Sequence, residues 1–155
     1  SLIDKLELAL FAGKIAAYAQ GFAVMEAASK EFSWNLPMAT IARIWRAGCI
    51  IRSQFLDTIA SAFEQNKGLS NLLLAPDFVT MMQGATPALR HIVARGAQEG
   101  LPLPALSSAL AFFDSYRQAR GTANLIQAQR DFFGAHGFKR LDGEGDFHGP
   151  WGQQQ

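Results

Sequence analysis

The sequence has few charged residues and a single cysteine. Charged side chains make up only 17% of its 155 residues, below the roughly one quarter that is usual in soluble domains. The lone Cys49 excludes an internal disulfide and a cysteine-based zinc cluster. The net charge is only +1, which argues against the concentrated basic face that nucleic-acid binding needs. We therefore expect no nucleic-acid partner and a reducing, cytoplasmic location.

Motifs that carry chemistry are also missing. The sequence has no strand followed by Gly-x-Gly-x-x-Gly, and the nearest string, Gly143–Gly149, has the wrong spacing and lies in a loop-like segment. His91, His136 and His148 do not have the spacing of metal ligands, and no Gly-x-Ser-x-Gly elbow occurs. We expect this chain to hold no catalytic residue, no cofactor-binding residue and no metal.

The sequence also predicts neither a membrane-spanning segment nor a secretion signal. No apolar run is expected to approach the roughly 18 residues of a membrane span, and no basic-then-apolar signal sequence opens the chain. The chain has no initiator Met, and Ser1 leads directly into an amphipathic pattern. This beginning predicts a piece of a longer protein.

The pattern that is present predicts an all-α fold, because β-branched alternation does not recur along the chain. Apolar residues make up 49% of the sequence, enough for a multi-helix bundle with its own core. A long, central helix is predicted from Leu2 to about Lys30, buried on more than one side and thin enough for close helix packing. Its main apolar stripe consists of Leu6, Leu10, Lys14, Ala17, Gly21, Val24 and Ala28, and the neighbouring faces carry Phe11, Ile15, Tyr18, Phe22 and Met25.

Proline and glycine divide the rest of the chain into shorter helices. Pro37 is placed to start a second helix, Ile51 to Phe63 form a third that ends before Asn66, and Pro76 opens a fourth. Gly84–Pro87 is expected to break or kink that fourth helix, and the segment after it to stop at Gly96 or Gly100. An extended piece at residues 101–104 then leads into a helix from Ala105 to about Ala119.

Several basic residues have an ordinary structural explanation. Arg43, Arg46 and Arg52 have no acidic residue between Ile41 and Leu56, so distant carboxylates, helix-end carbonyls or a subunit contact should satisfy them rather than a ligand. His91 stands among apolar residues and is expected to be a packing residue.

The C-terminal residues differ in character from the rest. From Gly137 onward glycines interrupt any helix, while Phe138, Leu141, Phe147 and Trp151 space large apolar side chains along the segment. We therefore divide the chain into a helical domain, residues 1–136, and an extended Gly-rich tail, residues 137–155. Such a tail cannot bury its own aromatic side chains, so it either stays mobile or docks on another surface.

The densest local signal lies at Thr122–His136. Its apolar spacing predicts a helix that ends at Phe133 or Gly134, with Arg130 in the last turn and His136 just beyond it. Two nitrogen-bearing side chains at one helix end could bind an anion. Arg and His are also favoured there simply because they meet unpaired carbonyls and the negative end of the helix dipole, which repels anions. Spacing alone leaves both interpretations open.

The same stretch resembles a known family. Residues Ala123–His136 (ANLIQAQRDFFGAH) are similar to a signature near the C-terminus of 6-phosphogluconate dehydrogenases. Residues 14–22, 44–53 and 71–74 resemble the family's all-helical domain in the same order, and the resemblance extends from roughly Leu8 to Trp151. It implies an all-α C-terminal domain that forms a dimer core and is separated from its dinucleotide-binding domain.

The resemblance also implies a reaction and a narrow role for this chain. The family carries out NADP-dependent oxidative decarboxylation of 6-phosphogluconate to ribulose 5-phosphate in the pentose phosphate pathway, with its lysine base and glutamate acid upstream of the matched segment. Arg130 and His136 match two substrate ligands that reach across the dimer to the sugar phosphate, and the tail of one subunit inserts into the other. We therefore expect this chain to be inactive alone. The alternative is a non-catalytic helical dimerisation module.

Overall fold

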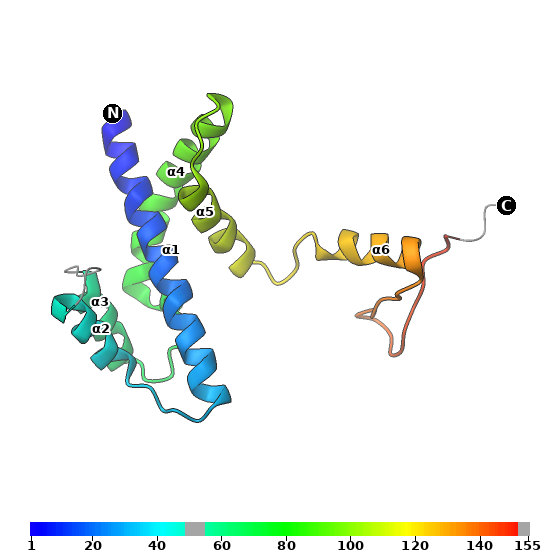
Figure 1. Ribbon diagram of the computed structural model, residues 1–155, viewed down its shortest axis with the longest axis horizontal. Coiled ribbons are helices and arrows are strands. Elements are labelled where there is room, and N and C mark those ends of the chain that lie inside the picture. Colours follow the sequence, from blue (N-terminus) through cyan, green and yellow to red (C-terminus); the bar gives the residue numbers. More distant parts are fainter. Residues whose placement is uncertain (49–54, 152–155) are drawn as a thin grey trace. The chain divides into compact units, whose positions relative to one another are not determined.

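The computed structural model describes residues 1–48 and 55–151 (Figure 1). The predicted all-α class is confirmed: among these residues the one β feature is an isolated antiparallel bridge between Phe138 and Phe147. The chain forms two compact units, Ser1–Phe113 and Asp114–Gln155, so the second unit begins before the tail that the sequence delimited. The helices are α1 (Leu2–Glu31), α2 (Met38–Gly48), α3 (Phe55–Gln65), η1 (Leu72–Leu74), α4 (Pro76–Gln98), α5 (Pro104–Tyr116) and α6 (Ala123–Gly134).

Helix α1 is the long helix of the first unit, and it packs along α4 (Figure 1). It starts with a capping box in which the Ser1 hydroxyl accepts the Asp4 N–H and the Asp4 carboxylate accepts from the Ser1 amino group. At its other end the Ser29 hydroxyl accepts the N–H of Leu36, which ties the following loop back to the helix. A serine hydroxyl thus accepts a backbone N–H near each end of this central helix.

Helix α1 is buried on the neighbouring side of the predicted stripe rather than along its main line. Ile15, Ala16, Ala19 and Phe22 lie in the core, whereas Leu6, Leu10 and Val24 of the main predicted stripe are 45%, 66% and 63% exposed. The helix is apolar on nearly all sides, so periodicity alone could not select the core-facing side. The first unit thus carries an unburied apolar stripe along α1.

The apolar character of α1 also corrects the expectation about membrane spans. Helix α1 has 30 residues and contains an 18-residue window of mean hydropathy 1.4, so by length and composition it could cross a membrane. The core helix of a soluble protein meets the same criteria. Ile15 and Phe22 belong to the shared core of the first unit, so α1 is a core helix of that unit.

Helix α4 continues through Gly84–Pro87, so the predicted break is wrong. Pro87 lies inside one helix of 23 residues, although a proline there removes a backbone hydrogen bond and costs about 3 kcal/mol. Phe78, Met82 and Leu89, before and after this point, are buried in the same core, and their burial outweighs that local cost. The helix ends as expected between Gly96 and Gly100, where Gly100 has φ +69° and the Leu101 N–H donates to the Gly96 carbonyl.

The basic residues of the first unit have partners at a distance in the sequence. Arg43 pairs with Glu64, and Arg46 pairs with Asp57, so distant carboxylates satisfy two of the three arginines as expected. Arg52 lies outside the described residues. His91 is exposed at the surface rather than packed in the core, and its Nε2 lies 3.4 Å from the Nζ of Lys5.

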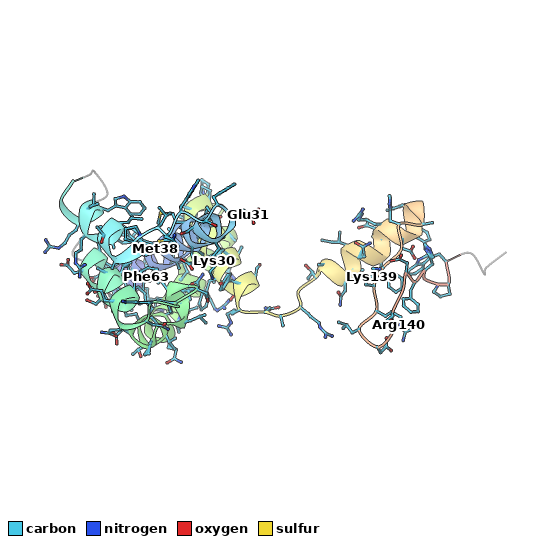
Figure 2. All side chains as sticks on the ribbon, turned by 90° about the horizontal axis from the view of Figure 1, so that it is seen from below. Lys30, Glu31, Met38, Phe63, Lys139 and Arg140 are labelled. Atoms are coloured by element: carbon cyan, nitrogen blue, oxygen red, sulfur yellow. The ribbon has the colours of Figure 1, made fainter. Side chains whose placement is uncertain are left out.

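The core of the first unit is shared by several helices. Met38 of α2 and Phe63 of α3 are buried in it, whereas Lys30 and Glu31 at the end of α1 are exposed (Figure 2). Helix α5, which ends at Tyr116 rather than Ala119, lies beside α1, where a Cβ on Gly13 would come within 2.9 Å of Leu106 Cδ2. A largely apolar groove of ≈ 410 Å³ runs along α1 and α5, lined by Leu10, Lys14, Ala17, Leu106, Ala109 and Phe112 among others.

Two glycines of α4 should respond oppositely to alanine. A Cβ at Gly84 meets no atom within 4 Å, so Gly84→Ala should raise the free energy of unfolding by about 1 kcal/mol through helix propensity. A Cβ at Gly96 would lie 2.5 Å from Leu103 Cδ1 and 3.2 Å from the Leu101 carbonyl, so Gly96→Ala should lower it by about 1–3 kcal/mol. Urea unfolding measures both values. Equal stabilisation by the two substitutions would contradict this packing of α4.

Candidate functional site

The site that the sequence indicated lies at the end of α6, in the second unit. The helix ends at Gly134, as predicted, and Ala135 follows with φ 51° and ψ 39°. The Ala135 N–H donates to the carbonyl of Asp131 at 2.8 Å, which closes the helix with a left-handed residue. That conformation costs a non-glycine residue about 1–2 kcal/mol. The strained residue, Ala135, is the one at which the chain leaves the helix and turns towards His136.

Gly134 leaves room for the His136 ring, and its backbone angles are those of the helix. It remains within the helix, and a Cβ built on it would lie 2.8 Å from Nε2 and 3.0 Å from Cδ2 of His136. The imidazole therefore lies directly against the last turn of α6. Without a glycine at this position, the His136 ring would have to move.

The structure brings both predicted ligands to the C-terminal part of one helix, and both are exposed. Arg130 is on α6, and its Nη1 lies 3.3 Å from Oε1 of Gln127. His136 is two residues beyond the helix. Within the part of the chain that the structure describes, no group hydrogen-bonds to the His136 ring. Both side chains can therefore donate to a ligand in solution.

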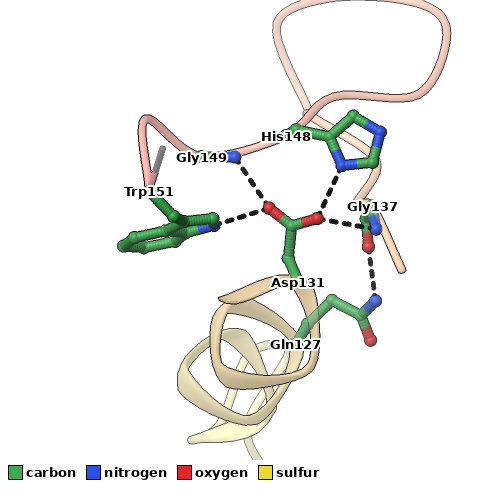
Figure 3. Close-up of polar contacts among 6 residues, drawn as sticks. All are labelled: Gln127, Asp131, Gly137, His148, Gly149 and Trp151. Carbon is green, nitrogen blue, oxygen red and sulfur yellow. Dashed lines mark hydrogen bonds and ion pairs between the residues drawn. The ribbon is translucent and has the colours of Figure 1, made fainter. Parts of the chain in front are cut away.

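Asp131 is the centre of the polar contacts around this helix end (Figure 3). Its side chain is buried, with only 2% of the residue exposed, and each oxygen accepts two hydrogen bonds. Oδ1 accepts from the Gly137 N–H at 2.8 Å and from His148 Nδ1 at 2.7 Å. Oδ2 accepts from the Gly149 N–H at 2.7 Å and from Trp151 Nε1 at 2.6 Å.

These donors set the electrostatics of the site. The Gly149 N–H makes the largest contribution to holding the pKa of Asp131 far below its usual range, and His148, Trp151 and Gly137 add to the effect. Burial acts in the opposite direction, because it disfavours the charged form. The carboxylate therefore stays ionised, with its charge already balanced by four donors.

The segment after α6 folds back onto the helix, while its aromatic side chains stay at least partly exposed. Phe138 and Phe147 exchange two backbone hydrogen bonds of 2.9 Å each, and the Arg140 guanidinium lies 5.3 Å from the Phe147 ring centroid. Trp151 meets Phe132 edge to face, with centroids 5.8 Å apart. The loop between the two bridged phenylalanines carries Lys139 and Arg140 (Figure 2).

Comparison with known proteins agrees with this local structure. Residues 1–151 match the family described as 6-phosphogluconate dehydrogenase, C-terminal domain. The chain belongs to the 6-phosphogluconate dehydrogenase family. The decarboxylating 6-phosphogluconate dehydrogenases of Klebsiella pneumoniae and Staphylococcus aureus are 54% and 52% identical to it over 149 residues, which is 96% of this chain and 32% of each relative. The chain thus spans about a third of the length of these relatives.

A solved structure of the family shows the same fold. The 6-phosphogluconate dehydrogenase of Plasmodium falciparum, studied in its apo form, with its cofactor NADP+ and with its substrate 6-phosphogluconate, superposes with a TM-score of 0.90 at 41% identity. The match covers 97% of this chain and 32% of that one. These similarities support an enzyme domain rather than the alternative of a non-catalytic module. They do not supply a dinucleotide site: the strand and glycine motif that would hold NADP do not occur in this sequence.

Sequence reasoning missed Asp131, the residue on which the site's geometry depends. A usable signal was present, because an acidic residue in the last turn of a helix faces the negative end of the dipole. An aspartate there is unfavourable unless specific donors surround it. The donors at positions 137, 148, 149 and 151 come from a loop whose path the local pattern does not determine.

Removing the charge of Asp131 should release the segment after α6. Asp131→Asn replaces one acceptor oxygen by an NH₂ group that cannot accept from these donors, so the indole N–H signal of Trp151 in NMR spectra should move towards its solvent-exposed position and exchange faster with water. The matched control is Asp142→Asn, which removes an exposed carboxylate paired with Arg140 in the same loop. An unchanged indole signal in Asp131→Asn would contradict the geometry.

The indole N–H signal of Trp151 also measures how the contact between Trp151 and Asp131 depends on pH. A carboxyl whose pKa is lowered in the folded state stabilises that state above its unfolded pKa, about 3.9 for Asp, and the stabilisation is lost as the pH falls through the folded value. The Trp151 contact should therefore be unchanged between pH 7 and about 4 and weaken only in stronger acid. Release of the indole near pH 6 would show that another group controls it.

Proposed function

We propose that this chain is the helical domain of a cytoplasmic enzyme that performs NADP-dependent oxidative decarboxylation of 6-phosphogluconate to ribulose 5-phosphate. The observation that carries the proposal is the family match over residues 1–151, which includes the whole of α6 and the turn after it. The Plasmodium falciparum relative has NADP+ as its cofactor and 6-phosphogluconate as its substrate. The hydride acceptor, the base and the acid are assigned to the part of the enzyme outside the matched third.

The role proposed for Arg130 and His136 is to bind the substrate phosphate in the neighbouring subunit's site. A guanidinium can donate to two phosphate oxygens at once, and an imidazole N–H can donate to a third. The negative end of the α6 dipole opposes this binding. Asp131 adds little further repulsion, because four donors already surround its carboxylate.

A homodimer is part of the same proposal. Leu10 and Val24 on α1 are exposed, and the groove beside α5 is largely apolar, so a second copy would remove apolar surface from water. Leu125 and Phe133 of α6 and Leu141 of the tail are each about three-quarters exposed, at 74%, 74% and 76%. These side chains support docking of the second unit and its tail on the partner subunit.

The test of the substrate site uses a chimeric enzyme. This chain replaces the matching third of the Klebsiella pneumoniae enzyme, and steady-state kinetics with 6-phosphogluconate and NADP are measured. Arg130→Ala should raise the KM for 6-phosphogluconate by roughly 10- to 100-fold, because a hydrogen bond between charged groups contributes about 1.5–3 kcal/mol. The control is Arg140→Ala, since Arg140 is paired with Asp142 in the tail.

Two further outcomes decide the assignment. Turnover by this chain alone would show that the chemistry resides within it, against the proposal. An active chimera with an unchanged KM in Arg130→Ala would remove Arg130 from the site. Calorimetric titration of 6-phosphogluconate into the chain alone then shows whether it retains any phosphate affinity without the rest of the enzyme.

The dimer is tested by light scattering at micromolar concentration. The chain should have twice the mass of a single 16.9 kDa chain, and Leu10→Asp should lower the mass towards that of one chain by placing a charge on the apolar stripe of α1. Glu7→Lys, at an exposed position of the same helix, is the control. A single-chain mass for the unsubstituted protein would refute the proposed dimer.

A further inference from the structure

Gly137, the residue that follows His136, is held at both its N–H and its carbonyl by side chains of α6. The Gly137 N–H donates to Oδ1 of Asp131 at 2.8 Å, and the Gly137 carbonyl accepts from Nε2 of Gln127 at 2.6 Å. Gln127 and Asp131 are four residues apart, so they lie one above the other on the helix (Figure 3). Gly137 is buried and has φ +70°, a conformation that suits glycine.

Gln127 also contacts the other proposed ligand. Its Oε1 accepts from Nη1 of Arg130 at 3.3 Å while its Nε2 donates to the Gly137 carbonyl. One side-chain amide therefore connects the guanidinium of Arg130 with the backbone that carries His136. An amide has both an acceptor and a donor end, and Gln127 uses both.

We propose that Gln127 and Asp131 are positioning residues of the phosphate site. They fix His136 through the backbone N–H and carbonyl of Gly137, and the Gln127 amide also holds the Arg130 guanidinium in place. This inference rests on the proposed function, because it assumes that Arg130 and His136 bind the substrate phosphate. Neither positioning residue touches the substrate. Their effect is to hold two donors in the binding geometry before the substrate arrives.

The tail extends this arrangement. Asp131 reaches Gly137 with the same oxygen that accepts from His148, and its other oxygen is held by Gly149 and Trp151. The carboxylate therefore cannot rotate without breaking contacts to residues 148–151. Folding of the tail onto α6 thus fixes the direction in which His136 leaves the helix, and loss of the tail contacts should loosen His136.

The main test is Gln127→Met in the chimeric enzyme. Methionine has nearly the same length and helix propensity as glutamine but makes neither hydrogen bond. The KM for 6-phosphogluconate should rise about tenfold with kcat within about twofold, because a displaced ligand loses binding geometry. Gln129→Met, at an exposed position of the same helix, is the matched control and should leave KM unchanged. Trp151→Phe, which keeps an aromatic ring but removes one donor to Asp131, should raise KM in the same direction.

A double-mutant cycle separates positioning from a general effect on folding. In a His136→Ala background one of the two positioned groups is gone and only Arg130 remains, so Gln127→Met should raise KM by clearly less than tenfold there, about threefold. An equal rise in both backgrounds would show a merely structural role and overturn the inference. An unchanged KM in Gln127→Met, with Arg130→Ala still impaired, would overturn the inference and leave the proposed function standing. An unimpaired Arg130→Ala would overturn both.

Discussion

The buried carboxylate of Asp131 is the contact on which the second unit depends. A charge at the negative end of a helix and out of water is unfavourable, and here four N–H donors from the following segment offset that cost. The same contacts close the turn after α6, with Ala135 in a left-handed conformation and Gly137 clamped behind His136. The geometry of the exposed site is therefore set by a residue that is itself hidden.

The first unit follows a different constraint, which is the close packing of α1 on α4. Small residues of α1, such as Ala12, Ala16 and Ala19, face the core of the first unit. The larger side chains of α1 are divided between this core and the surface. Burial against α1 keeps α4 continuous through Pro87 despite the local cost. What remains is an apolar stripe and groove on α1 and α5, a surface whose composition suits another protein chain better than water.

The two units divide the work of the proposed enzyme domain. The first carries the apolar surface on which the proposed dimer would form, and the second holds two exposed nitrogen-bearing side chains at the turn after α6. The part in catalysis that we propose for this chain is to bind and orient a phosphate group. Binding of a remote phosphate supports turnover by fixing the reacting carbons relative to groups held elsewhere.

The sequence by itself determined the helical class, the end of α6 near Gly134, and the family, because helix periodicity, helix-ending glycines and the ANLIQAQRDFFGAH stretch are local signals. It also indicated Arg130 and His136. It did not determine which side of α1 is buried, because that helix is apolar all round, nor that Pro87 would lie within a helix, because the compensating burial comes from another helix. Only the tertiary structure decided that Asp131 organises the site, since its partners lie up to 20 residues away and meet it only when the chain folds back.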